Sequence, residues 1–273
     1  MATEQIKTFQ KIIYDFYTHN KRDFLWRQDI SPYKIFVSEI MLQQTQTARV
    51  EPKFAAWLHK FPDFQSLASA STQQVLSAWQ GLGYNRRGLA LHGGAQRIVS
   101  EFNGCLPNNE QILQTFAGIG PNTAASICAF AFNVPVVFIE TNIRTVFLHH
   151  FFPEQTSIDD KQILQLVAAS LDKHNSRDWY YGLMDYGVYL KKEFKANNKG
   201  SRHFIKQSKF IGSRRQVRGA IIRILTQTKR LSHDDVCEFV KQDIPHCVHD
   251  VGVVLQQLIC EGLVQEHDEH YYL

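Results

Sequence analysis

The apolar residues of the first 190 positions recur at intervals of three and four, with almost no alternation of period two. This spacing places apolar side chains on one face of a helix. Prolines and the Gly118/Gly120 pair separate the apolar runs, which is typical of short connections between helices. The pattern predicts that this region is all-α. Representative runs are Phe9/Ile12/Ile13/Phe16, Val75/Leu76/Trp79/Leu82 and Leu164/Val167/Leu171.

The residues after position 195 follow a different pattern. The segment KANNKGSRH, residues 195–203, is polar, glycine-containing and basic, and we expect a basic linker over residues 196–212. Three helical patterns follow within 213–273, and Ser232 and Asp235 have the spacing of a capping box at the start of the second one. The last segment, LVQEHDEHYYL, has two β-prone ends around a polar turn, which predicts a hairpin. Three helices and a hairpin resemble a winged-helix domain, although the third helix carries no basic residue.

Positive charge is concentrated in one part of the chain. The net charge is only +4, yet the run from Lys191 to Arg230 contains thirteen Lys or Arg and one acid, Glu193. That run carries +12, so the rest of the chain sums to −8. A run this dense favours a polyanionic partner over a merely solvated surface. Binding through phosphate contacts would weaken steeply as the salt concentration rises.

The sequence argues against a membrane protein, a secreted protein and a metal-binding protein. No apolar run reaches the roughly 18 residues of a transmembrane helix, and the N-terminus MATEQIKTFQ lacks the apolar core of a signal peptide. The five cysteines lack metal-ligand spacing, so we expect reduced thiols and no metal site. We therefore expect no membrane association, and a location in the cytoplasm on the nucleoid, or in the nucleus of a host that has one.

The segment AGIGPNTAASI contains a glycine turn at the start of a helix. Gly118 and Gly120 allow a tight turn, and Pro121 suits the first turn of a helix. Backbone N–H groups at such a helix start favour a phosphate, although an ordinary corner between two helices has the same pattern. We expect Gly118, Gly120 and Thr123 to contact a nucleic-acid backbone.

Two glutamates occupy unusual positions. Glu39 lies within the apolar helical segment SPYKIFVSEIML and is followed by Gln43 and Gln44. A glutamate among large apolar residues is either paired or held at a raised pKa, whereas an ordinary helix would expose it to solvent. Glu140 follows the apolar run Val136–Ile139, where the simplest interpretation is a helix start.

Four segments together resemble the MutY branch of the helix–hairpin–helix (HhH-GPD, endonuclease III) superfamily of DNA glycosylases. They are LWRQDISPYKIFVSEIMLQQTQTARV, WQGLGYNRRGLALH, AGIGPNTAASI and FIETNIRTVF, and they keep the family order over residues from about 5 to 190. The resemblance implies a mainly α, two-lobed fold. Its expected parts are a lobe of residues 1–28 and 136–195, a six-helix lobe 29–135 with the hairpin at about 110–132, the basic linker 196–212, and the winged-helix-like α/β unit 213–273.

The resemblance also implies roles for individual residues. Glu39 matches the acid that protonates the departing base. Glu140 matches an aspartate that stabilises positive charge on the sugar or attacks it, and Asn142 matches an asparagine that helps to hold the catalytic water. We expect Arg144 to assist the amides that keep Glu140 ionised, and Asp185 to have a structural pairing role. The expected base-pocket or stack residues are Arg27, Gln43, Gln44, Tyr84 and Asn122, and the expected DNA-backbone contacts are Gly118, Gly120, Thr123, Lys191, Lys192, Arg214 and Arg215.

The chain departs from the family pattern at three places. Asn122 stands where bifunctional lyases carry a lysine, and it cannot form a Schiff base. Lys191 stands at the first ligand position of the family's iron–sulfur cluster, and no cysteine occurs between Cys128 and Cys237, so we expect no cluster. We hypothesise that the basic run replaces its role. The MutY branch carries a C-terminal Nudix-like domain that binds 8-oxoguanine, whereas this chain has the winged-helix-like residues 213–273 instead. The sequence therefore does not determine which base lies opposite the excised one.

The resemblance implies a monofunctional DNA glycosylase of base excision repair that hydrolyses the N-glycosidic bond of a flipped mispaired or damaged base, adenine in the first place. A thymine or uracil mismatch glycosylase and a non-catalytic module that binds distorted DNA remain the alternatives. The expected partner is double-stranded DNA with a mismatch or lesion, bound by a monomer. We expect no cofactor, and leave open a monovalent cation at the hairpin.

Overall fold

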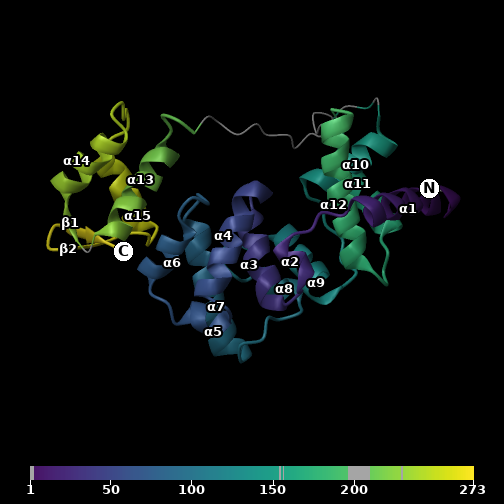
Figure 1. Cartoon of the computed structure of the whole chain (residues 1–273), viewed down its shortest axis with the longest axis horizontal. Helices are drawn as coiled ribbons and strands as arrows, with labels where there is room; N and C mark the ends of the chain where they lie inside the picture. The colour runs from purple at the N-terminus through teal and green to yellow at the C-terminus, as the bar shows by residue number, and fades with distance from the viewer. Residues whose placement is uncertain (1–2, 154, 156, 196–209, 229) are drawn as a thin grey trace. The chain divides into compact units, whose positions relative to one another are not determined.

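The computed structural model describes residues 3–153, 155, 157–195, 210–228 and 230–273 (Figure 1). Contacts divide the chain into two compact units. The first unit comprises Met1–Glu39, Asn108–Thr115 and Ile119–Lys206, and the second comprises Ile40–Pro107, Phe116–Gly118 and Gln207–Leu273. The expected linker 196–212 falls mostly outside the described residues, which omit 196–209.

The first unit is helical. Its core is aromatic: the Phe9 ring lies 5.3 Å from that of Phe147, 5.0 Å from that of Phe151 and 5.9 Å from that of Trp179, centroid to centroid. These rings come from α1, α10 and α12, which therefore pack together around one apolar centre. Its helices are α1 (Thr3–Asn20), α2 (Leu25–Gln28), α3 (Pro32–Leu42, which continues into the second unit), α8 (Glu110–Leu113), α9 (Pro121–Phe132), α10 (Thr141–Phe151), α11 (Asp160–Ser170) and α12 (Ser176–Glu193).

Asp185 is a buried acid within the first unit. Its carboxylate accepts hydrogen bonds from Arg22 Nε at 2.6 Å and Arg27 Nη1 at 2.8 Å. It also accepts one from the Arg22 backbone N–H at 2.9 Å. An ionised carboxylate is tolerated in a protein interior when it is paired and hydrogen-bonded in this way. The structural pairing role expected for Asp185 is confirmed.

The second unit combines four consecutive helices with the C-terminal segment. Arg87 is central to it: the buried guanidinium donates to the carbonyl oxygens of Ile40 at 3.0 Å, Met41 at 2.9 Å and Leu82 at 3.1 Å. One side chain therefore ties the end of α3 to the loop that follows α6. The consecutive helices are α4 (Thr47–Lys60), α5 (Phe64–Ala68), α6 (Thr72–Trp79) and α7 (Arg86–Phe102).

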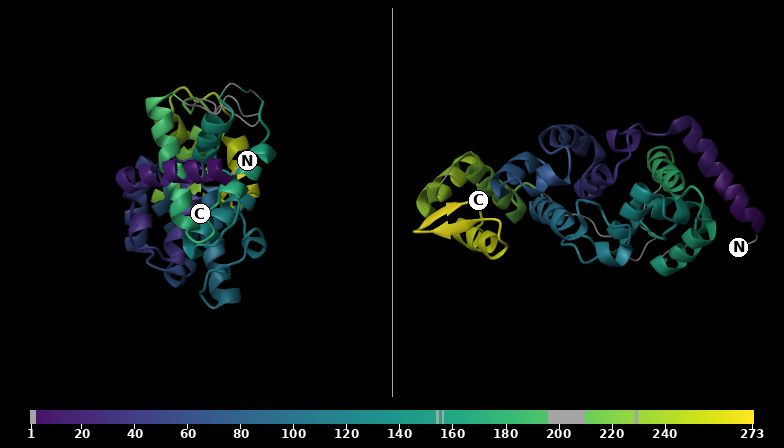
Figure 2. Two further views of the ribbon diagram at one scale, coloured as in Figure 1. Left: turned by 90° about the vertical axis from the view of Figure 1, so that its right-hand side faces the viewer. Right: turned by 90° about the horizontal axis from the view of Figure 1, so that it is seen from below.

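The C-terminal segment contains the three predicted helices and the predicted hairpin, which Figure 2 shows as arrows. The elements are α13 (Arg214–Gln227), β1 (Leu231–Ser232), α14 (His233–Asp243), α15 (Val251–Cys260), β2 (Gln265–His267) and β3 (His270–Tyr272). The sequence did not predict β1, which pairs antiparallel with β3 in the sheet order β1-β3-β2. Two residues are too short to show a period, so only the sheet partner defines this strand.

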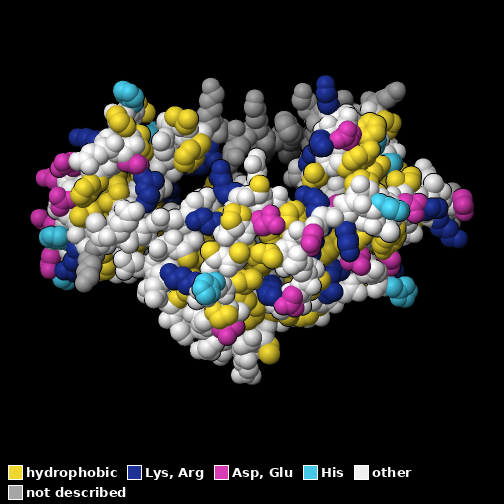
Figure 3. All heavy atoms as spheres, in the orientation of Figure 1, with side chains coloured by type: hydrophobic (Ala, Val, Ile, Leu, Met, Phe, Trp, Pro, Cys, Tyr) yellow, Lys and Arg dark blue, Asp and Glu magenta, His cyan; other side chains and the backbone are white. Residues whose placement is uncertain are grey.

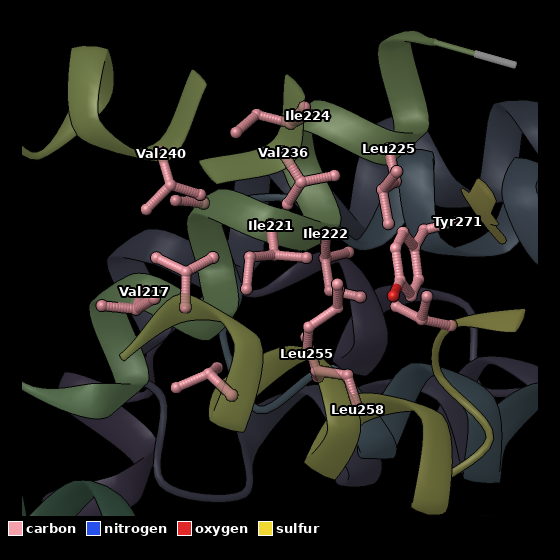
Figure 4. Close-up of a cluster of buried hydrophobic side chains, with 14 of the residues drawn as sticks. Val217, Ile221, Ile222, Ile224, Leu225, Val236, Val240, Leu255, Leu258 and Tyr271 are labelled. Carbon is pink, nitrogen blue, oxygen red and sulfur yellow. The ribbon is translucent and has the colours of Figure 1, made fainter. Parts of the chain in front are cut away.

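The apolar core of this segment takes in a side chain from α6. Its members include Val217, Ile221, Val236 and Leu255, and Figure 4 shows the cluster in close-up. Leu76 of α6 is 1% exposed and belongs to the same cluster. Residues 213–273 are expected to form a domain of their own, whereas in the structure they belong to the same compact unit as residues 40–107 and share this core with Leu76.

Two kinds of feature are missing from the described residues. Over these ranges, no helix is long and apolar enough to span a lipid bilayer. The same part of the chain shows no group of three or more His, Cys, Asp or Glu side chains that could hold a metal ion.

Candidate active site

Glu39 is the only ionisable residue among the last six positions of α3, Val37–Leu42. The neighbouring Phe36, Val37 and Ile40 are at most 1% exposed. Desolvation in these apolar surroundings raises the pKa of Glu39 to about 7, and the charge of Glu140 adds to the rise, while a hydrogen bond from Ser126 and the charge of Arg27 oppose it. The expectation of a raised pKa is confirmed, and a carboxyl that titrates near neutrality can serve as a general acid.

Ser126 of α9 is the hydrogen-bond partner of Glu39. Its Oγ lies 2.5 Å from Glu39 Oε2 and 3.0 Å from the Thr123 carbonyl oxygen. A hydroxyl has one proton to donate, so it serves the ionised carboxylate in one state and the carbonyl in the other. Sequence reasoning missed Ser126, and its place one helical turn after Thr123 is the only signal that could have pointed to it.

Glu140 is the N-cap of α10, as its position after an apolar run predicts. Its Oε1 accepts from the backbone N–H groups of Asn142 at 2.7 Å and Ile143 at 3.0 Å, and Oε2 accepts from Asn142 Nδ2 at 3.3 Å. Burial raises the pKa of Glu140 above its usual range, and these donors together with the charge of Lys191 offset only part of that rise. All three of these hydrogen-bonding groups are donors, which is the arrangement that favours an ionised carboxylate.

The basic neighbour of this site is not the expected one. Arg144 donates to Asp160 from Nε at 3.0 Å and from Nη2 at 2.7 Å, so its guanidinium is committed to another acid. Lys191 of α12 takes its place, with Nζ donating to Asn142 Oδ1 at 2.6 Å. The expected contact of Lys191 with the DNA backbone stays a prediction, and the half-buried lysine already has Asn142 as a partner.

Arg27 is a buried neighbour of Glu39. Its side chain is 7% exposed and forms an ion pair with Asp185. Its guanidinium carbon lies 4.1 Å from the centre of the Tyr181 ring. The charge of Arg27 lowers the pKa of Glu39. Its expected place at the base pocket or in the DNA stack stays a prediction.

The glycine turn has the predicted geometry. Gly118 has a φ of +75°, Gly120 is the N-cap of α9, and Pro121 occupies the first turn. Gly118, Gly120 and Asn122 are exposed, while Thr123 is half-buried. An exposed helix start of this kind is suited to bind a phosphate, and the expected backbone contacts stay a prediction.

The two glutamines after α3 lie near the hairpin or at the surface. Gln43 Nε2 donates to the Gly118 carbonyl at 3.0 Å, which ties the end of α3 to the glycine turn. Gln44 is exposed, with a left-handed φ of +55°. A left-handed residue of this kind is uncommon outside turns and marks the sharp end of the helix.

Tyr84 stands at the tip of the loop between α6 and α7. Its φ is +49°, and its side chain is exposed. The Arg87 guanidinium lies 5.4 Å from the ring centre, and Arg215 Nη1 donates to the hydroxyl at 3.1 Å. Arg215 therefore contacts Tyr84, and its expected contact with the DNA backbone stays a prediction. Arg87 was also missed by sequence reasoning, since its burial depends on tertiary contacts.

The rest of the described basic run is only partly available for phosphate contacts. Arg218 pairs with Glu261 at 2.5 Å, and Arg223 pairs with Asp243. Figure 3 shows basic and acidic side chains intermixed over the C-terminal helices on the face that it draws. Lys192 and Arg214 are exposed, as a phosphate contact requires.

The residues at the end of α12 do not fit the iron–sulfur cluster that the resemblance implies. Such a cluster needs four thiolates. Lys191 and Lys192 occupy the last turn of α12, Cys128 is buried within α9, and the next cysteine in the sequence is Cys237 on α14. We derive no step through a cluster.

Comparison with known proteins gives a consistent family. Residues 37–172 match the HhH-GPD superfamily base excision DNA repair protein model. The adenine DNA glycosylase of Mycolicibacterium smegmatis is 38% identical over 156 residues, which are 57% of this chain and 53% of that protein. The adenine DNA glycosylase of Buchnera aphidicola subsp. Baizongia pistaciae is 31% identical over 196 residues, 69% of this chain and 55% of that protein. The chain thus spans about half the length of these curated relatives.

Solved structures share the fold. The structure of a thermostable thymine-DNA glycosylase matches with a TM-score of 0.62 and 22% identity, over 72% of this chain and 92% of that one. At this identity the likeness concerns the fold alone. The mainly α, HhH-GPD-like architecture expected from the sequence is confirmed.

Proposed function

Because the chain belongs to the HhH-GPD superfamily of base excision DNA repair proteins, we propose that it is a monofunctional DNA glycosylase that releases adenine from mispaired DNA. The observation that carries the proposal is a pair of carboxyl groups in different surroundings. Glu39 lies among apolar side chains, and Glu140 lies at a helix start among N–H donors. The two carboxyl groups interact electrostatically, because the charge of Glu140 raises the pKa of Glu39.

Glu39 is the general acid of the proposed reaction. Its pKa of about 7 leaves a large fraction protonated at neutral pH. The acid gives its proton to a nitrogen of the base as the N-glycosidic bond breaks, which makes the base a neutral leaving group. Ser126 then donates to the newly formed carboxylate.

Glu140 stabilises the sugar when the base departs. Breaking the bond leaves oxocarbenium character on the sugar, and a fixed carboxylate beside it lowers the energy of that state or forms a transient bond with it. Asn142 holds Glu140 through its backbone N–H and its side-chain amide. Water completes the reaction by hydrolysis, as in glycoside hydrolases with two carboxyl groups.

Asn122 supports hydrolysis without strand cleavage. A lyase needs an amine that attacks the sugar carbon and forms a Schiff base. Asn122 lies two residues after Gly120, where the family resemblance places that lysine, and its amide is not a nucleophile of this kind. We propose that the protein leaves the DNA backbone intact after the base is released.

The proposed substrate is duplex DNA whose adenine leaves the helical stack. The exposed amides at the start of α9 receive a backbone phosphate, and Lys192 and Arg214 add positive charge. Tyr84 enters the stack beside the flipped base. Adenine is chosen because the curated relatives are adenine DNA glycosylases.

A panel of duplexes tests the proposal. Single-turnover assays use A:8-oxoguanine, A:G, T:G, U:G and a hypoxanthine pair, each read with and without alkaline cleavage. We expect alkali-dependent cleavage at adenine, its loss in Glu39→Gln and Glu140→Gln, and full activity in Glu4→Gln, which changes an exposed glutamate on α1. Release of thymine or uracil instead would favour the mismatch alternative, and release of no base would favour a DNA-binding module. Cleavage without alkali, or trapping by borohydride, would refute the monofunctional proposal.

A further inference from the structure

We infer that Lys191 is a positioning residue for the active site, which orients the Asn142 amide and thereby holds Glu140 as an ionised carboxylate. The inference rests on the proposed role of Glu140 in base release. In this role Lys191 acts within the active site, through Asn142, and not through a contact with DNA.

Three polar groups form a chain from α12 to the reacting centre. Lys191 Nζ donates to Asn142 Oδ1 at 2.6 Å, and Asn142 Nδ2 donates to Glu140 Oε2 at 3.3 Å. An ammonium can only donate, so the amide must turn its oxygen towards Lys191. Its NH2 group then necessarily faces Glu140. Without Lys191 the amide is free to turn over and to present its oxygen to the carboxylate, where two acceptors would repel each other.

The approach of α12 to α10 explains why Lys191 reaches Asn142. Gly187 precedes Lys191 by one helical turn, and a Cβ atom at Gly187 would lie 2.4 Å from the Asn142 carbonyl oxygen and 2.8 Å from Asn142 Cβ. Those distances are too short for any side chain, so a glycine lets the two backbones meet. The last turn of α12 is thereby held against the first turn of α10.

Lys191 is the cation that acts on Glu140 from this side of the site. Two charged groups interact with Glu140, Lys191 from α12 and Glu39 from α3. Two further cations act on these neighbours: the charge of Arg27 from α2 acts on Glu39, and that of Arg144 from α10 acts on Lys191. Arg27 is paired with Asp185, and Arg144 is paired with Asp160. The charge of Lys191 lowers the pKa of Glu140, and the charge of Glu140 in turn raises the pKa of Lys191 against the effect of burial. The two groups therefore stabilise each other's ionised forms.

Two substitutions of Lys191 separate its charge from its hydrogen bond. Lys191→Met removes both, while Lys191→Gln keeps an N–H donor for Asn142. Lys7→Met is the control, because Lys7 is an exposed lysine on α1 with no part in the proposed site. We expect base release to slow by about tenfold to a hundredfold in Lys191→Met at pH 7, by less in Lys191→Gln, and not at all in Lys7→Met. The acidic limb of the rate–pH profile should move to higher pH in both Lys191 variants. Without the lysine charge the pKa of Glu140 rises, so Glu140 becomes protonated at a higher pH as the solution is acidified.

A measurement without DNA keeps this inference separate from the proposed function. Protein labelled with 13C at glutamate carboxyl carbons is titrated by NMR, and the Glu140 signal is assigned from its loss in Glu140→Gln. The Glu140 midpoint should rise in Lys191→Met and Lys191→Gln and stay unchanged in Lys7→Met. An unchanged midpoint in a folded Lys191 variant overturns the inference whatever the activity. A wild-type protein that releases no base refutes the proposed function, while the titration still decides the coupling between Lys191 and Glu140. If Lys191→Met does not fold, Lys191→Gln supplies the same two readouts.

Discussion

Ser126 joins the acid of the active site to the glycine hairpin. Its Oγ lies 2.5 Å from Glu39 Oε2 and 3.0 Å from the carbonyl oxygen of Thr123 in the first turn of α9. When Glu39 is ionised, the hydroxyl donates to the carboxylate. When Glu39 is protonated, its own O–H can donate to Ser126, whose proton then serves the Thr123 carbonyl. The helix start that is proposed to hold DNA thus also supports both states of the acid.

Replacing Ser126 by alanine should extend activity to higher pH. The Ser126 hydrogen bond lowers the pKa of Glu39, so its removal raises that pKa above the present value of about 7. Glu39 must be protonated to act, and the alkaline limb of the profile therefore moves upward in Ser126→Ala. Single-turnover rates from pH 5 to 9 measure the limb, with the exposed Ser77→Ala as the control. A limb that stays in place would show that Glu39 is not the group that titrates there.

Ionisation of Glu39 should lower the free energy of unfolding of the protein above neutral pH. Its folded pKa of about 7 exceeds the 4.5 of an unperturbed glutamate, so the stability linked to this group is present below about pH 4.5 and is lost as the pH rises through 7. Glu39→Gln, which cannot ionise, should therefore gain up to about 3 kcal/mol over the wild type between pH 5 and pH 8. Urea unfolding at both pH values measures the difference, and Glu4→Gln should show none.

Shortening Glu140 by one methylene should impair catalysis more than stability. Aspartate is a good N-cap, so Glu140→Asp can still serve the first amides of α10. Its carboxylate, however, is set back by about 1.5 Å. A shift of this size costs about a hundredfold in rate unless the pocket adapts. We expect a large fall in single-turnover rate with little change in thermal unfolding temperature. A fully active Glu140→Asp would mean that the site does not depend on the longer acid.

Arg215 and Tyr84 should act as a coupled pair. Arg215→Ala and Tyr84→Phe each remove the same hydrogen bond of 3.1 Å. Their effects on binding to mismatched duplex should therefore be non-additive, with a coupling energy of about 0.5–1.5 kcal/mol in a double-mutant cycle. Arg214→Ala is the matched control: it should lower the salt dependence of binding and show no coupling to Tyr84→Phe. Additive effects would place Arg215 outside the Tyr84 site.

Neutralising Asp185 should destabilise the first unit. The carboxylate is 2% exposed and pairs with both Arg22 and Arg27. Asp185→Asn leaves two guanidinium groups without their anion, and we expect a loss of about 3–5 kcal/mol in urea unfolding. Asp15→Asn, an exposed member of an i,i+4 pair on α1, should change stability by less than about 0.5 kcal/mol. Equal effects of the two substitutions would argue against a structural role for Asp185.

The local pattern of the chain was sufficient to locate the helices, the glycine turn and the two glutamates. The apolar spacing predicted the helices, because each helix must bury one face. The end of an apolar run and the start of a helix coincide at Glu140, and that local coincidence predicted its capping role. Glu39 was identified by its apolar neighbours on the same helix, and desolvation by those neighbours is the main cause of its raised pKa.

The partners of these residues depended on the tertiary structure. Arg144 lies closer to Glu140 in sequence, yet it pairs with Asp160, and Lys191 reaches the site from 49 residues beyond Asn142. Arg27 pairs with Asp185, which lies 158 residues further along the chain, and Arg215 contacts Tyr84 from 131 residues away. Sequence spacing specifies which face of a helix is apolar, but a long cationic side chain has several acceptors within reach. Which acceptor it takes is decided by how closely the helices approach, as Gly187 shows for α10 and α12.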